Sequence, residues 1–164
     1  MRLLPYRRFT IETALAPAQV QARLRGGIEQ ERTFRFSKPT QPFTGSINGP
    51  SFDVMRNVAG RNSFRPRVRG TIEAAGSGTR VIGTMQLHEI IMVFIGAFIV
   101  AAGSVFLSGV ARSVASRQLE PAMLIALAVL VGLVAMTLGG FFVEVRSSFS
   151  ALVQLVDGSR ADLQ

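Results

Sequence analysis

Two long apolar runs dominate the hydrophobic pattern of the second half of the chain. Residues 90–111 and 122–143 each contain 22 residues without a charge, and each run holds 12 Leu, Ile, Val or Phe side chains. A helix needs about 20 apolar residues to cross the roughly 30 Å hydrocarbon layer. At about −0.4 kcal/mol for each such side chain, insertion of either run is favoured by roughly 5 kcal/mol before Gly and Ser reduce it. The pattern therefore predicts a transmembrane helical hairpin over residues 89–143.

Two alternatives give weaker accounts of these runs. Helices that are apolar on every side could form a buried hairpin in a soluble protein, but the chain has only about 120 other residues with which to cover them. A cleaved signal peptide would need an apolar segment near the start, whereas the first nine residues read MRLLPYRRF. We therefore expect the first apolar run itself to direct the chain to a membrane.

The first 88 residues alternate between apolar and polar positions, as half-buried strands do. Phe9 and Ile11 indicate a first strand, and a short amphipathic helix follows from Pro17, with apolar side chains at Val20, Leu24 and Ile28. The period of two returns with Phe34 and Phe36, and it continues through Phe43 and Ile47, Phe52 and Val54, Val68 and Ile72, and Val81 and Met85. These strands predict an antiparallel β-meander, and residues 1–88 are expected to form a β-rich soluble domain.

Turn residues separate the expected strands. Asn48 and Gly49 form the strongest short hairpin signal in the chain, and residues 75–78 (Ala-Gly-Ser-Gly) indicate a second hairpin. Residues 59–62 are expected to form a further turn, and Pro66 favours an edge or a bulge in the strand that follows.

Residues 144–164 are expected to form a C-terminal amphipathic helix. Its apolar positions, spaced as on one face of a helix, are Val145, Phe149, Leu152, Val153 and Val156. We expect this helix to pack on the sheet, because the short N-terminal helix is too small to cover it. The alternative is a helix in the membrane interface, although such helices usually carry more Lys and Arg. The fold class is therefore α+β, a meander with N- and C-terminal helices and an added transmembrane hairpin.

Charge favours one orientation. Residues 1–88 carry 14 Arg or Lys against 5 Asp or Glu, which places both termini in the cytoplasm if basic segments stay inside. When only Arg and Lys near the two spans are counted, the charge gives no preferred orientation, since Arg80 and Arg146 lie on one side and Arg112 and Arg117 on the other. The chain has no Cys, which excludes disulfides, thiolate metal sites and cysteine nucleophiles.

The segment RNSFRPRVRGTIEAAGSGTRVIGTMQLHEIIMVF, residues 61–94, resembles a pattern in an uncharacterised family of bacterial two-span membrane proteins. The pattern is an Asn-Ser-Phe with a nearby Pro, a Gly-Thr hairpin, and Leu-His before a pair of transmembrane helices. This resemblance implies a bacterial inner-membrane location and no particular activity. The order of elements also resembles the helix-grip fold of START-like lipid-binding domains, with a hairpin inserted before the last helix.

No motif of catalysis appears in the sequence. The chain has a single His, His88, and a metal site needs several ligands, so we expect His88 to be an interfacial residue. The dinucleotide, P-loop and nucleophile-elbow patterns are absent, and Asp53 and Glu73 have no second acid placed beside them. The two apolar runs also lack the ionisable groups that transporters need. We expect no enzymatic activity, no cofactor and no bound metal.

Two groups of residues are candidates for contacts. Alternation places Arg65, Arg67, Arg69 and, on the next strand, Arg80 on one side of the sheet, where they could contact anionic lipid or a partner protein. A merely solvated face is the alternative, and nucleic acid is not expected because interleaved aromatic residues are few. Small residues spaced four, three and four apart could let the two spans approach closely: Ala97, Ala101, Ser104 and Ser108 in the first, and Ala128, Gly132, Ala135 and Gly139 in the second.

The resulting expectation is a non-catalytic, membrane-anchored module that contacts a partner membrane protein or anionic lipid. A membrane-anchored domain that binds a lipid or another hydrophobic ligand in an internal cavity is the alternative. Membrane lipids are partners in either case, and the sequence leaves homo-oligomers open.

Overall fold

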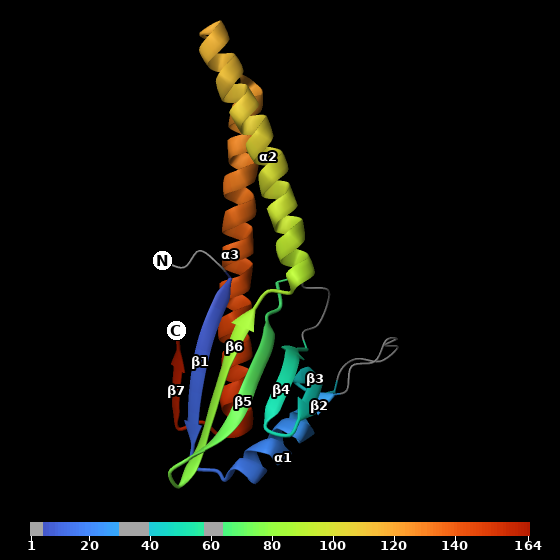
Figure 1. The fold of residues 1–164 in the computed structure, drawn as a ribbon, viewed down its shortest axis with the longest axis vertical. Coiled ribbons are helices and arrows are strands. Elements are labelled where there is room, and N and C mark those ends of the chain that lie inside the picture. The colour runs from blue at the N-terminus through green and yellow to red at the C-terminus, as the bar shows by residue number, and fades with distance from the viewer. Residues whose placement is uncertain (1–4, 30–39, 58–63) are drawn as a thin grey trace. The chain divides into compact units, whose positions relative to one another are not determined.

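The computed structural model describes residues 5–29, 40–57 and 64–164 (Figure 1). The chain divides into two compact units: Met1–Leu87 together with Phe141–Gln164, and His88–Gly140. The first is called the sheet unit below, and the second is called the hairpin unit.

The sheet unit is a mixed α+β structure built on seven strands. Their bounds are β1 (Tyr6–Thr13), β2 (Ile28–Glu29), β3 (Phe43–Asn48), β4 (Ser51–Arg56), β5 (Arg67–Ala75), β6 (Gly78–Gln86) and β7 (Arg160–Leu163). The strand order is β2-β3-β4-β5-β6-β1-β7, and the helix α1 (Pro17–Gly27) connects β1 to β2. The α+β class is confirmed.

The sheet is not the purely antiparallel meander that the sequence predicts, because β2 runs parallel to β3. A parallel pair needs a connection of about a dozen residues, since the chain must return to the starting edge. Residues 30–42 provide that length. The strand expected at Phe34 and Phe36 and the turn expected at 59–62 lie outside the described residues.

The hairpin expected at Asn48–Gly49 is confirmed, with a shift of one residue. Asn48 pairs with Ser51, so the two-residue loop is Gly49–Pro50. Gly49 has a φ of 57°, whereas proline holds φ near about −65°, which together fit a type II′ turn rather than type I′. The hairpin between β5 and β6 is also present, with a loop at Gly76–Ser77.

Alternation along the strands gives the sheet two different faces. The inner face carries the side chains of Phe9, Ile11, Val54, Val68, Val81 and Met85, each at most 1% exposed. Val20 and Leu24 of α1 and Phe141, Val145, Leu152 and Val156 of α3 (Pro121–Val156) are also buried. The rings of Phe9 and Phe149 meet edge to face at 6.1 Å between centroids. Figure 1 shows the C-terminal part of α3 behind the strands, so this helix segment and α1 cover the inner face.

The expected arrangement of terminal helices is wrong in one respect. Residues 144–164 do not form a separate helix, because α3 runs without interruption from Pro121 to Val156 and the chain ends in β7. No Gly or Pro occurs between Phe141 and Val156, so nothing in the sequence breaks the helix there. The helix ends at Val156; the next residue, Asp157, has a left-handed φ of 54°, and Arg160–Leu163 then pairs with β1.

The hairpin unit consists of α2 (Glu89–Ser116) and the first part of α3. Both helices are long and apolar enough to cross a membrane, by length and composition. In the most apolar stretch of each helix, none of α2 and 11% of α3 is buried within the protein. The helices are joined by a short turn at Arg117, which has a left-handed φ of 54°.

Candidate functional site

The strand register places three of the four candidate arginines on one face of the sheet. Arg67 and Arg69 of β5 and Arg80 of β6 lie on the outer face, opposite to the side covered by α1 and α3. Arg65 precedes β5, and its Nη1 donates to the backbone oxygen of Arg56 at 3.5 Å. The structure therefore groups Arg67, Arg69 and Arg80 by face and leaves Arg65 apart.

Asp53 of β4 neutralises part of this group. Its two carboxylate oxygens accept hydrogen bonds from Nε and Nη2 of Arg67, both at 2.7 Å, and Oδ2 accepts a third from Nε of Arg69 at 3.0 Å. Partial burial by itself raises the pKa of the Asp53 carboxyl, but the hydrogen bonds and charges of the two arginines outweigh it and hold the pKa below its ordinary value. Asp53 is therefore ionised at neutral pH and binds two guanidinium groups at once.

The rest of the outer face is also nearly balanced in charge. Arg80 donates from Nε and Nη2 to Oε1 of Glu12, at 3.1 and 2.8 Å. By register, the described part of this face carries five arginines (Arg8, Arg67, Arg69, Arg80, Arg160) and four carboxylates (Glu12, Asp53, Glu73, Asp162). The outer face as a whole is thus not the strongly basic surface that the sequence pattern suggests.

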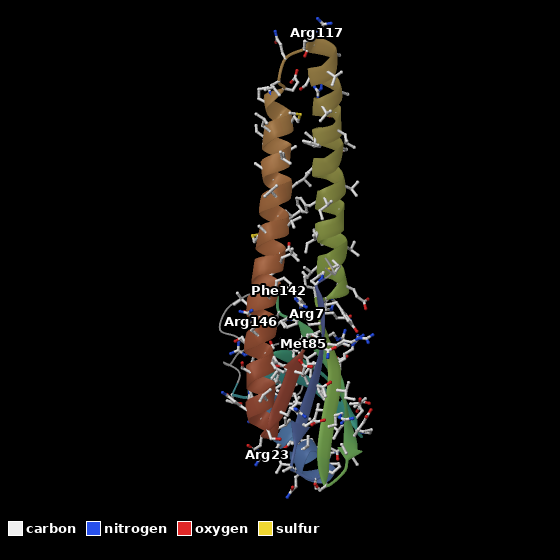
Figure 2. The ribbon with its side chains drawn as sticks, turned by 90° about the vertical axis from the view of Figure 1, so that its left-hand side faces the viewer. Arg7, Arg23, Met85, Arg117, Phe142 and Arg146 are labelled. Carbon is white, nitrogen blue, oxygen red and sulfur yellow. The ribbon has the colours of Figure 1, made fainter. Side chains whose placement is uncertain are left out.

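Arginines do gather at one end of the sheet, the end at which β6 stops and the chain leaves for α2. Tyr6 and Arg67 both pair with Gln86, and Met55 pairs with Arg67, so the neighbouring Arg7 and Arg56 lie at this end. The guanidinium of Arg7 lies 4.9 Å from the ring centre of Phe142 on α3, and Arg146 follows Phe142 by one helical turn; Figure 2 labels all three near this end of the sheet. We call this group the arginine end: Arg7, Arg56, Arg65, Arg67 and Arg146.

Sequence reasoning missed three members of the arginine end. Arg7 and Arg146 are 139 positions apart and belong to the same end only because α3 packs on the sheet, where Arg7 contacts Phe142. Arg56 lies at the end of β4, where the strand pattern fades. The alternation that identified Arg67 and Arg69 could not find residues grouped by tertiary packing.

The small-residue stripes do not form the contact between the two helices of the hairpin unit. All eight residues are exposed, and a Cβ atom added at Gly132 or Gly139 would meet nothing within 4 Å. Gly109 on α2 and Ala126 and Thr137 on α3 are buried instead. A Cβ at Gly109 would lie 2.8 Å from the Cβ of Met123, so the close approach occurs at this glycine.

His88 has a structural role as the N-cap of α2, because its Nδ1 accepts a hydrogen bond from the backbone N–H of Ile90 at 3.3 Å. Within the described ranges, no three His, Asp or Glu side chains lie together in a way that could hold a metal ion.

Comparisons with protein-family models, with curated proteins and with solved structures find no match. The class that fold and surface define is therefore an α+β protein with two helices of membrane-spanning length and an arginine-rich sheet end. The resemblances seen in the sequence, to a bacterial two-span family and to the helix-grip fold, stay hypotheses.

Proposed function

We propose that this protein is a non-catalytic module anchored in the bacterial inner membrane by α2 and the first part of α3, and that its arginine end binds anionic lipid headgroups. The observation that carries the proposal is the grouping of arginines at the end of the sheet where the chain continues into α2, three residues after Gln86. If α2 crosses the bilayer, this end lies at the headgroup level. Each Arg near an anionic surface contributes about 1 kcal/mol of attraction.

The contact of Arg7 with Phe142 supports the same role. A guanidinium held over a ring keeps its donors available to phosphate oxygens. Arg146, one helical turn after Phe142, is exposed to solvent. The proposal thus rests on the arginines of the sheet unit and on the short connection from β6 to α2.

The alternative function, binding of a hydrophobic ligand between sheet and helices, is not favoured by any observation on the described residues. The inner face is filled by side chains that are nearly inaccessible, including Phe9, Phe43, Val68, Met85 and Leu152. Because this core is closely packed, a ligand would have to bind at the surface of the sheet unit.

The experiment measures lipid selectivity in the full-length protein. After purification in a mild detergent, native mass spectrometry would compare the retention of phosphatidylglycerol with that of phosphatidylcholine. We expect phosphatidylglycerol to be preferred. In the double variant Arg7→Gln with Arg146→Gln, the preference for phosphatidylglycerol over phosphatidylcholine should fall about 30-fold, because two contacts of about 1 kcal/mol each are removed.

The matched control is Arg23→Gln. Arg23 lies on α1 at the opposite end of the sheet unit, where its Nη1 is 3.7 Å from Asp157 (Figure 2). This variant removes one positive charge, half the change in the double variant, and it should keep the preference. A loss of about fivefold in Arg23→Gln would mean that net charge alone attracts the lipid, and no loss in the double variant would exclude the arginine end as the binding surface.

A further inference from the structure

The outer face of the sheet contains a hollow that no described helix covers. Its volume is about 600 Å³, and it extends over β1, β6, β5, β4 and β3. Two cross-strand rows of side chains form its walls, and the backbone of Phe52, Gly70 and Gly83 forms its floor. We call this hollow the outer-face trough.

One wall of the trough is charged. In register order it consists of Ser46, Asp53, Arg69, Thr84 and Arg8. Asp53 is shared between Arg67 and Arg69, so one carboxylate serves two guanidinium groups. Arg8 donates from Nε to the hydroxyl of Tyr6 at 3.2 Å and makes no ion pair with the described residues. The charged wall therefore has an excess of positive charge, centred on Arg69 and Arg8.

The opposite wall is uncharged. It consists of Asn48, Ser51, Thr71 and Ile82, and the Ile82 side chain is 36% exposed, which is unusual for an isoleucine in the centre of a sheet. The trough therefore has one cationic side, one hydroxyl-rich side and one exposed apolar contact. A ligand that satisfies all three is amphipathic and anionic.

The dimensions of the trough favour an extended ligand. Arg69 and Arg8 lie on strands separated by β6, so their Cα atoms are about 10 Å apart, which is far for a single phosphate to bridge. The five strands span about 19 Å, the length of about six residues of extended chain. Neither wall contains an aromatic side chain, and Tyr6 is the one aromatic residue on the outer face among those that line the trough, so there is no platform on which successive bases could stack.

We propose that the outer-face trough binds an extended acidic segment of a partner protein, with carboxylates on Arg69 and Arg8 and an apolar side chain on Ile82. Charge complementarity selects the carboxylates, and the exposed Ile82 selects a peptide that alternates acidic and apolar residues. The lining of the trough contains no member of the arginine end, although Asp53 also binds Arg67, and the proposal does not depend on lipid binding.

The test uses the full-length protein in nanodiscs of phosphatidylcholine, so that anionic lipid plays no part. The probe is a fluorescent peptide of about six alternating Glu and Leu residues, the length that spans the trough, and the reference is the same peptide with Gln in place of Glu. Fluorescence anisotropy measures the two dissociation constants at one fixed salt concentration. We expect the Glu peptide to bind at least about tenfold more tightly than the Gln peptide.

Variants assign the binding to the trough. Arg8→Gln and Arg69→Gln should each weaken binding of the Glu peptide about fivefold, and Thr84→Glu, which places a negative charge between them, should weaken it further. The control is Arg160→Gln, which removes a charge from the same face outside the trough and should change the dissociation constant by less than about twofold.

Three results would overturn the proposal: equal binding of the two peptides, equal weakening by Arg160→Gln and Arg8→Gln, or full displacement of the Glu peptide by inorganic phosphate at the peptide's own concentration. The last would identify a site for a small anion. Since the nanodiscs contain only neutral lipid, a negative result with the peptide would not affect the proposed binding of anionic lipid at the arginine end, which is tested separately.

Discussion

Two glycines in neighbouring strands show how single residues shape the sheet unit. Gly70 and Gly83 pair across β5 and β6, and the ring of Phe52 lies over the first while the ring of Phe9 lies over the second. A Cβ at Gly70 would be 2.5 Å from Cζ of Phe52, and one at Gly83 would be 2.6 Å from Cζ of Phe9. Glycine therefore makes room for two aromatic rings on the inner face.

The Asp53 carboxylate gives a prediction at the same scale. Asp53→Asn should lower the free energy of unfolding at pH 7 by about 0.5–1 kcal/mol, a modest value because all three partners are partly exposed. The pKa of Asp53 is lower in the folded protein than its ordinary value of about 3.9. Its contribution is therefore fully present above about pH 4 and is lost as the pH falls through the lowered pKa.

Chemical denaturation of the full-length protein in detergent at pH 7, 5 and 3 would measure this difference. Asp162→Asn is the control, since Asp162 lies on the same face and its carboxylate accepts only from Nε2 of Gln164 among the described residues. A difference between wild type and Asp53→Asn that stays constant down to pH 3 would contradict the assignment.

At the scale of elements, the sequence predicts the strands and turns in which apolar and polar positions alternate clearly. Strand alternation identified the positions of Phe9, Ile11, Val68, Val81 and Met85, and turn residues identified both hairpins. The short strand β7 was missed because Arg160–Leu163 offers only four residues and pairs with the distant β1. The continuity of α3 was missed because a change from apolar to amphipathic composition was interpreted as a helix boundary, although composition alone does not break a helix.

The contact between α2 and α3 could not be predicted for a related reason. The apolar runs 90–111 and 122–143 carry no charged residue, so no charged face shows which side of each helix meets the other. Small residues occur on more than one side, and the stripes chosen by spacing, from Ala97 to Ser108 and from Ala128 to Gly139, lie on the exposed sides. The close contact depends on Gly109 and Met123, which the spacing rule did not single out.

Leucine substitutions compare these two surfaces. Gly109→Leu should destabilise the hairpin by about 1–3 kcal/mol, because the new side chain would overlap Met123. Gly132→Leu should be nearly neutral, because its added Cβ meets nothing within 4 Å. Unfolding in detergent, followed by circular dichroism, would measure both. A larger loss in Gly132→Leu than in Gly109→Leu would show that the small-residue stripes make the closer contact after all.

At the scale of the whole molecule, the sheet unit is assembled from both sides of the hairpin unit. The chain leaves the sheet after Leu87 and returns at Phe141, and residues beyond Phe141 supply part of the core as well as β7. If the apolar helices cross a membrane, the residues before and after them must lie on the same side, because both segments contribute to one core. The even number of spans satisfies this requirement.

The remaining question at this scale is which side holds the sheet unit, and the absence of native Cys makes it testable. We expect the cytoplasmic side, because residues 1–88 carry 14 Arg or Lys against 5 Asp or Glu and basic segments are retained inside. Ser116→Cys lies at the end of α2 and Ser159→Cys just before β7, and both positions are exposed. A membrane-impermeant maleimide added to intact cells should label position 116 alone, and both positions after lysis. Labelling of position 159 alone in intact cells would reverse the orientation and place the arginine end against the outer leaflet. Labelling of both positions in intact cells would mean that positions 116 and 159 do not lie on opposite sides of the membrane.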